Sequence, residues 1–359
     1  MAERLVARGT SVMLEHGGLP EVLNPYLIDL IEQTGGVNGP IGLQFISQPE
    51  RERAVTHEEL SDPLLEEEHE VAPGLVYKYE GGEDEYGPYP GRALFTITRN
   101  CAAYCRYCTR GREVGIPKTK EGPLKGALSH TPHLSRQQID ESLNFVTTHP
   151  EINEIILSGG DPMTVHPEVM KYLFARLGHM QAIGQLDIVR IGTRLPIHNP
   201  RAINEHHLEA LSYLTHPRLM IHMNHASELT TESLDALHRM QDVSRGVVMS
   251  QSVLLKGVND NPRTLRDLFN KVAKEGFVPY YVYQNDPVDW AAHFTVPLDE
   301  AYQIWSQVRP VLSGVAATAR LVIDTPNGYG KIPLPEGGAW DVNFASGFAD
   351  FKGERKQFL

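Results

Sequence analysis

The sequence predicts an α/β protein built around a parallel sheet. From residue 93 onward, short apolar runs rich in β-branched residues alternate about six times with amphipathic segments of helical period. Such alternation is typical of strands joined by right-handed crossover helices. Hydrophobic residues make up 41% of the 359 residues and charged residues 22%, which suits a globular chain with a sizeable core.

The individual elements follow from their period and their caps. Leucines spaced on one face predict a short helix within residues 21–34. Ser135 is placed to cap a second helix, and Asn261 followed by Pro262 opens another. The expected strands are 94–98, 154–157, 188–193, 219–223, 247–253 and 278–283, and one more apolar run covers 320–324.

Two stretches near the N-terminus show no such period. Residues 62–70 hold a run of glutamates, which we expect to form a solvated surface. Residues 80–88 are rich in glycine and acidic residues, and they are expected to form a flexible loop.

Composition limits the partners of this protein. The formal net charge of −12 disfavours a nucleic-acid partner, because phosphates attract clustered Lys and Arg. No apolar run approaches the length that crosses a membrane, and the first residues lack the apolar region of a signal peptide. Nothing in the cysteine usage suggests an oxidising compartment, so we expect a cytoplasmic protein.

All three cysteines of the chain fall within eight positions, as Cys101, Cys105 and Cys108. Three thiolates can hold a 4Fe-4S cluster and leave one iron open to a further ligand. A structural zinc site would need a fourth ligand and normally a second pair downstream, which the sequence lacks. A disulfide would leave one thiol over, and unpaired buried cysteines would rarely fall into so compact a pattern.

Further candidate residues stand where the expected strands end, which is where reactive groups gather in parallel α/β sheets. Gly159, Gly160 and Asp161 follow the second strand, Arg194 ends the third and Gln251 lies in the fifth. Two glycines allow close approach of the backbone to a ligand, although an ordinary turn has the same composition. Arg194 and Gln251 also suit a buried ion pair and a buried amide.

Two further positions are ambiguous from the residues alone. Lys331 follows a strand-like run and a glycine-rich turn, but a lysine at such a place is usually a surface charge. His222 and Asn224 share one face at the end of the fourth strand, where we expect satisfied pocket-lining or core side chains rather than a metal site.

The spacing C-x3-C-x2-C resembles that of the radical S-adenosylmethionine (SAM) superfamily, and the string CAAYCRYCTRGREVG is similar to the lysine 2,3-aminomutase family. This resemblance implies a partial (β/α)6 barrel with an N-terminal helical extension and a C-terminal extension that carries a lysine for pyridoxal phosphate (PLP). The implied division is 1–90 for the N-terminal extension, 91–300 for the core barrel and 301–359 for the C-terminal segment.

The resemblance also implies a role for each candidate residue. It assigns the cluster to Cys101, Cys105 and Cys108; SAM to Gly159, Gly160, Asp161, Arg194 and Gln251; a Schiff base with PLP to Lys331; the PLP phosphate to Arg92; the substrate carboxylate to Arg110; and the distal ammonium of lysine to Asp286 and Asp324. Two carboxylates aimed at one cation would favour a basic amino acid over glutamate.

Two departures from the family pattern are visible. The family places another basic residue before the tyrosine that precedes Arg92, whereas Pro88 precedes Tyr89 here, so a second phosphate contact is missing from the sequence pattern. Longer members bind zinc through additional cysteines, but Asn261 stands at one of those positions and the C-terminal tail has none. We therefore expect no zinc.

The implied activity is the PLP-dependent movement of the α-amino group of L-lysine to the β-carbon, started by a 5'-deoxyadenosyl radical. Such chemistry requires an electron donor such as a flavodoxin or a ferredoxin. The oligomeric state is left open, and a homo-oligomer is one of the possibilities. Arginine or ornithine could replace lysine as the substrate, and Asp289 is a candidate contact for them. Two different classes of function also stay open: a radical enzyme without PLP that acts on a peptide or RNA, and an iron-sulfur electron carrier.

Overall fold

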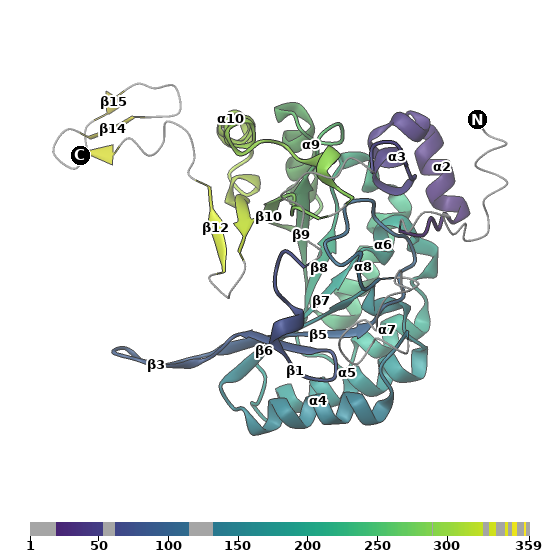
Figure 1. Ribbon diagram of the computed structural model, residues 1–359, viewed down its shortest axis with the longest axis vertical. Coiled ribbons are helices and arrows are strands. Elements are labelled where there is room, and N and C mark those ends of the chain that lie inside the picture. The colour runs from purple at the N-terminus through teal and green to yellow at the C-terminus, as the bar shows by residue number, and fades with distance from the viewer. Residues whose placement is uncertain are drawn as a thin grey trace.

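The structure is a computed structural model. It describes residues 19–52, 62–114, 132–288, 290–325 and 330–334, together with the backbone of three short strands, β13 (Val342–Asn343), β14 (Gly347–Ala349) and β15 (Arg355–Lys356). The predicted α/β class is confirmed by the arrangement of strands and helices in Figure 1.

A ten-stranded sheet organises the described part of the chain. In spatial order its strands are β1 (Glu70–Ala72), β2 (Leu75–Tyr79), β5 (Gly91–Thr98), β6 (Ile152–Gly159), β7 (Ile188–Thr193), β8 (Arg218–His222), β9 (Val247–Leu254), β10 (Val278–Gln284), β11 (Arg320–Asp324) and β12 (Lys331–Pro333). From β5 to β11 each neighbouring pair is parallel. The antiparallel strands β1, β2 and β12 lie at the two ends of this parallel block, so the barrel is open rather than closed.

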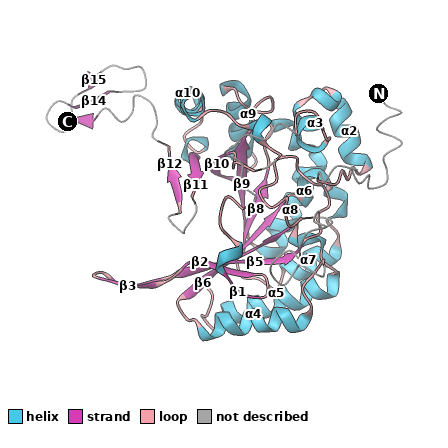
Figure 2. Cartoon of the chain, in the orientation of Figure 1, coloured by secondary structure: helices cyan, strands magenta, loops and turns pink. Residues whose placement is uncertain are grey.

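Helices connect the parallel strands and lie along the outer side of the curved sheet (Figure 2). They are α4 (Arg136–Thr148), α5 (Pro167–Ala182), α6 (Leu195–His198), α7 (Glu205–Leu211), α8 (Thr231–Ser244), α9 (Pro262–Lys274) and α10 (Leu298–Val308). Two more helices, α2 (Pro25–Gln33) and α3 (Pro40–Phe45), precede the sheet in the chain. The helix expected within residues 21–34 is therefore confirmed as α2.

The helix boundaries have local causes. Ser135 Oγ accepts a hydrogen bond from the Gln138 amide, and Gln138 Oε1 accepts one from the Ser135 amide at 2.9 Å, which forms the capping box of α4. Asn261 Oδ1 accepts from the Thr264 amide at 2.9 Å to begin α9, with Pro262 at the first helical position. These caps confirm both predicted helix starts.

The core lies between the sheet and its helices. Ile155 and Leu157 on β6 and Phe174 and Leu177 on α5 are all fully buried in one continuous cluster. Burial of each such side chain contributes about 1.5 to 3 kcal/mol. The packed side of the sheet thus holds the strands rigid, and their carboxyl ends can carry functional groups.

The sheet extends across both predicted boundaries, the one between residues 90 and 91 and the one between residues 300 and 301. Strand β2 pairs with β5 before residue 91, and β11 pairs in parallel with β10 after residue 300. The three-part division remains a prediction, but the strands of the first and last parts belong to the same sheet as the core.

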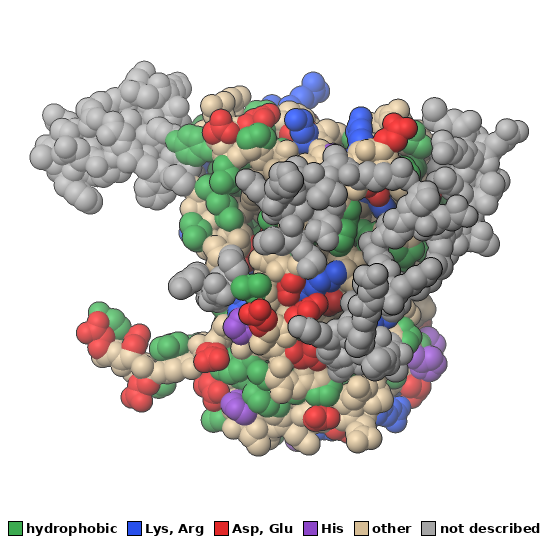
Figure 3. Space-filling model, viewed as in Figure 1, with side chains coloured by type: hydrophobic (Ala, Val, Ile, Leu, Met, Phe, Trp, Pro, Cys, Tyr) green, Lys and Arg blue, Asp and Glu red, His purple; other side chains and the backbone are tan. Residues whose placement is uncertain are grey.

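The acidic stretch 80–88 forms a hairpin, so the prediction of a flexible loop there is wrong. Strands β3 (Gly82–Asp84) and β4 (Gly87–Tyr89) pair antiparallel and project away from the body of the molecule (Figure 1). Asp84 Oδ1 accepts from the Tyr86 amide at 2.8 Å, and Gly87 has a φ of +107°, so the turn itself directs the return of the chain. Figure 3 shows acidic side chains along this hairpin.

Across the described ranges, no helix combines the length and the apolar character that a membrane span requires.

Candidate functional site

Two adjoining cavities open at the carboxyl ends of the parallel strands. The first, which we call the cysteine lobe, has a volume of about 210 Å³ and is lined by Cys101, Cys105 and Cys108. The second, the lysine lobe, has a volume of about 250 Å³ and is lined by Lys331 and Asp324. Both lobes share a wall that includes Arg110, Ser158, Gly192, His222 and Gln251.

The three thiols line the cysteine lobe as free cysteines. Burial raises the pKa of the Cys101 thiol, and Asp161 and the other two thiols raise it further. Burial together with Cys105 raises the pKa of the Cys108 thiol to about 12. The thiolate form therefore needs nearby positive charge, which iron supplies. No three described His, Cys, Asp or Glu side chains are grouped tightly enough for a single metal ion. A set of three thiols around one lobe suits an iron-sulfur cluster.

The two glycines at the end of β6, Gly159 and Gly160, are required by a close backbone approach. Gly159 has a φ of +124°, and a Cβ there would lie 2.2 Å from the Thr98 carbonyl oxygen. A Cβ on Gly160 would lie 2.1 Å from the Asn100 carbonyl oxygen. Both glycines line the cysteine lobe, so the end of β6 packs directly against the chain that enters the cysteine motif.

Asp161 is almost fully buried and holds the ends of β6 and β7 together. Its carboxylate accepts hydrogen bonds from Thr193 Oγ1 at 2.7 and 2.9 Å and from the backbone amides of Met163, Arg194 and Leu195 at 2.9 to 3.1 Å. Because protein donors occupy the side chain, any contact of Asp161 with SAM would use its backbone. The predicted contact through this residue remains a prediction.

Arg194 lies at the centre of a buried polar network beside the cysteines. Its Nη1 donates to Cys105 Sγ at 2.9 Å, and its Nη2 pairs with Glu228 Oε1 at 2.5 Å. The exposed fractions of the two charged side chains are 5% and 1%. The sequence left a structural ion pair open for Arg194, and that ion pair is present; a contact with SAM stays a prediction.

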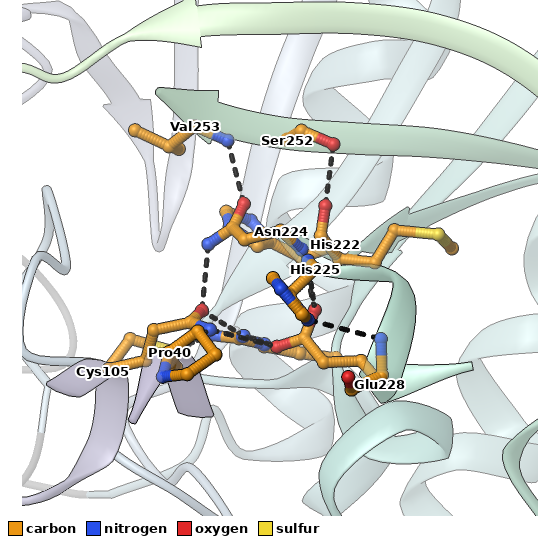
Figure 4. Close-up of polar contacts among 12 residues, drawn as sticks. Pro40, Cys105, His222, Asn224, His225, Glu228, Ser252 and Val253 are labelled. Atoms are coloured by element: carbon orange, nitrogen blue, oxygen red, sulfur yellow. Dashed lines mark hydrogen bonds and ion pairs between the residues drawn. The ribbon is translucent and has the colours of Figure 1, made fainter. Parts of the chain in front are cut away.

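Residues distant in the sequence complete this network. Gln44 Oε1 from α3 accepts from Arg194 Nη2 at 2.6 Å and from Asn224 Nδ2 at 2.9 Å. Figure 4 shows Asn224 and Glu228 among these contacts, with Cys105 at their edge. His222 Nε2 lies 3.1 Å from the Tyr107 hydroxyl, and burial together with Arg194 lowers the pKa of His222 to about 3. His222 is thus a satisfied residue of the shared wall and Asn224 is a satisfied, fully buried residue, which is what we expected of the two.

The lysine lobe presents an amine beside a carboxylate. Lys331 Nζ lies 3.1 Å from Asp324 Oδ1 and 5.5 Å from the centre of the Tyr283 ring. Gly330, with a φ of +80°, turns the chain into β12 directly before the lysine. The exposed fraction of the Lys331 side chain is 27%, so the amine is turned into the lobe rather than into bulk solvent.

Arg92 and Lys78 bring two more cations to this lobe. The Arg92 guanidinium stacks 4.0 Å from the centre of the Tyr79 ring, and Tyr79 and Arg92 are register partners of β2 and β5. Lys78 Nζ donates to the carbonyl oxygens of Leu64 at 2.8 Å and Thr325 at 3.1 Å. From the sequence, the second basic residue is expected directly before Tyr89, where Pro88 stands instead. Lys78 was missed because the hairpin β3–β4 separates it from Arg92 in the chain.

The remaining predicted contacts lie at the shared wall and at the lysine lobe. Gln251 donates to the Tyr283 hydroxyl at 3.0 Å, and Asp286 Oδ2 accepts from Thr109 Oγ1 at 2.8 Å. Burial, with Asp324 and Glu66 nearby, raises the pKa of Asp286 to about 6. Asp289 lies outside the described residues.

Arg110 is paired with a residue of the glutamate run. Its Nε and Nη2 donate to Glu66 Oε2 at 2.8 Å and to Glu66 Oε1 at 2.6 Å. Glu66 is 7% exposed, so the prediction of a solvated surface is wrong for this residue. A buried carboxylate persists here because the arginine fork satisfies both of its oxygens.

The chain is similar to several known proteins. A family model described as "Radical SAM superfamily" matches residues 95–269. The L-lysine 2,3-aminomutase of Bacillus subtilis is 32% identical over 88% of this chain and 61% of its own length. That of Escherichia coli is 36% identical over 76% of this chain and 72% of its own length.

The chain belongs to the lysine 2,3-aminomutase family. As a member of this family of radical SAM enzymes, it is expected to bind a 4Fe-4S cluster and SAM, which the superfamily match supports. The family also includes a relative with another substrate in its name, the glutamate 2,3-aminomutase of Clostridioides difficile. It is 28% identical over 87% of this chain and 67% of its own length. Family membership alone therefore leaves the amino acid open.

Proposed function

We propose that this chain is a radical SAM aminomutase that uses PLP to move the α-amino group of L-lysine to the β-carbon. The observation that carries the proposal is the wall shared by the two lobes, which brings Lys331 and the three cysteines to one continuous site. An electron carrier without a substrate would not require the second lobe.

The residues of the lysine lobe fit PLP. Lys331 offers an amine for its aldehyde, and Arg92 and Lys78 offer cations for its phosphate. When bound, PLP and the SAM-derived radical supply the bond-making chemistry. The protein positions these groups, pairs their charges and excludes water from the space between them.

The charges of the lysine lobe favour a basic amino acid. Asp286 and Asp324 give the lobe two carboxylates, which suit a distal ammonium group. Arg110 at the shared wall is the cation for the substrate carboxylate. A glutamate side chain would meet two like charges at the aspartates, which disfavours it.

One experiment tests both the cofactor and the reaction. The protein is reconstituted anaerobically with iron, sulfide and PLP, and then incubated with SAM, a reductant such as reduced flavodoxin, and lysine, arginine, ornithine or glutamate. We expect β-lysine from lysine and a borohydride-fixed PLP label on Lys331. The variant Lys331→Ala should lose the label and the product, while Lys274→Ala, at an exposed position of α9, should keep both. Product from glutamate alone, or a label at another lysine, would refute the proposal.

A further inference from the structure

The pairing of Arg110 leaves part of its guanidinium available. An arginine side chain has five N–H donors in one plane. Two of those of Arg110 go to the Glu66 carboxylate, and Nη1 donates to Ser158 Oγ at 3.1 Å. Within the described contacts, one N–H on Nη1 and one on Nη2 remain. Ser158 lines both lobes, so Nη1 is at their shared wall.

Glu66 is itself held firmly in place. It lies in the segment Asp62–His69, whose Asp62 and Glu67 both pair with Arg112 at 3.2 Å. Asp62 Oδ2 also accepts from the Glu67 amide at 3.0 Å. The acidic segment is thus anchored to the residues that follow the cysteine motif, with Glu66 directed at Arg110.

The Glu66 carboxylate carries charge at neutral pH. Burial alone would raise the pKa of Glu66, but the charge and the hydrogen bonds of Arg110 outweigh it and hold the pKa below its ordinary value. Two ionised groups in bidentate contact fix the plane of the arginine fork more firmly than a single hydrogen bond does.

We propose that Glu66 is a positioning residue that holds Arg110 by its Nε–Nη2 edge, so that the Nη1–Nη2 edge receives the carboxylate of the amino acid substrate. This inference rests on the proposed function, because it concerns the same substrate. It adds a residue that makes no substrate contact itself and acts through Arg110. The opposite arrangement, in which Glu66 occupies the substrate's place and must leave, predicts the opposite change in KM.

The test compares Glu66→Gln with Glu68→Gln in the reconstituted full-length enzyme. Glu68 lies in the same turn but is exposed, so its variant is a matched control. We expect the KM for lysine to rise about tenfold in Glu66→Gln with a smaller change in kcat, and to stay within about twofold in Glu68→Gln. Binding of lysine amide, which lacks the carboxylate, should change less than binding of lysine.

Each further outcome decides the matter. An unchanged or lowered KM in Glu66→Gln, or an equal loss of binding for lysine and lysine amide, would overturn the positioning role. Glu66→Asp keeps the charge but moves it one methylene away from Arg110, so its KM for lysine should also rise. If Glu66→Gln does not fold, Glu66→Asp replaces it in the test. A wild-type enzyme that turns over no amino acid would instead refute the proposed function, and the inference with it.

Discussion

Asp324 and Lys331 are register partners in the antiparallel pair β11–β12, and their side chains meet with Oδ1 and Nζ 3.1 Å apart. The carboxylate that we assign to the substrate ammonium therefore already has a cation beside it. A substrate ammonium that reaches Asp324 must exchange with the Lys331 amine or share the carboxylate with it. The two proposed functions of the lobe, cofactor attachment and substrate selection, are thus coupled through one contact.

This coupling predicts a charge-specific loss in Asp324→Asn. We expect kcat/KM for lysine to fall roughly ten- to hundredfold, because hydrogen bonds to charged groups contribute about 1.5 to 3 kcal/mol. Norleucine, which lacks the distal amine, is the matched substrate and should lose little in binding. Equal losses of binding for lysine and norleucine would show that Asp324 acts only on Lys331.

Asp286 predicts an acidic limb in the pH profile. Because its pKa is raised from 3.8 to about 6 by burial, with Asp324 and Glu66 adding to it, the group loses its charge as the pH falls through about 6. We expect kcat/KM for lysine to decline over that range. Thr109→Val removes the hydroxyl that stabilises the ionised form, so its limb should move to higher pH, and Asp286→Asn should lack the limb. A limb that survives in Asp286→Asn would assign the titration to another group.

The same shift has a consequence for stability with a defined sign. The folded pKa of Asp286 exceeds the value of 3.8, so protonation favours the folded state. Its contribution is fully present below pH 3.8 and is lost as the pH rises through about 6. We therefore expect wild type to lose stability relative to Asp286→Asn as the pH rises from 3.8 through about 6. Thermal unfolding of both proteins across this range measures that relative stability.

Lys78 is predicted to hold the PLP phosphate together with Arg92. In Lys78→Ala the affinity for PLP should fall about tenfold or more, since one charge-assisted hydrogen bond is lost. Lys78→Arg keeps the cation and should bind PLP more tightly than the alanine variant does. Titration of the apoprotein with PLP, followed by absorption, gives both constants. An alanine variant with wild-type affinity would remove Lys78 from the phosphate site.

The buried pair Arg194–Glu228 is predicted to stabilise the cysteine lobe. Removing one partner of a buried ion pair costs about 3 to 5 kcal/mol, so Glu228→Gln should lower the free energy of unfolding by that order and reduce the iron bound after reconstitution. The control is Glu232→Gln, which breaks a solvent-exposed pair with Arg201 and should therefore change the free energy of unfolding much less. Similar small losses in both variants would contradict a supporting role for Arg194.

The strands and the positions of the motifs could be predicted because both depend on local signals. Each predicted strand is present, and Gly159, Arg194 and the cysteines lie at strand ends as the alternation required. A run of β-branched residues or a pair of adjacent glycines can be recognised from a few consecutive residues.

The supporting residues could not be found in this way because their partners are distant in the chain. Gln44 and Glu66 reach the site from segments before the sheet, and nothing in their own surroundings distinguishes them from surface side chains. Lys78 is brought to Arg92 only by the pairing of β2 with β5. A run of glutamates looks solvated until the arginines that pair with it are placed by the fold.

The hairpin β3–β4 has a practical consequence for experiments on this enzyme. The chain leaves the sheet after Tyr79 and rejoins it at Gly91, one residue before Arg92, the register partner of Tyr79. The length of the hairpin between these points is therefore independent of the geometry of the site. At its tip, Tyr86 is 89% exposed. Apart from Gly87 and its two chain neighbours, no heavy atom of the described residues lies within 4 Å of the place where a Cβ on Gly87 would stand. A fluorophore, an affinity tag or a tethered reductase could be attached at this point without altering the wall that the two lobes share.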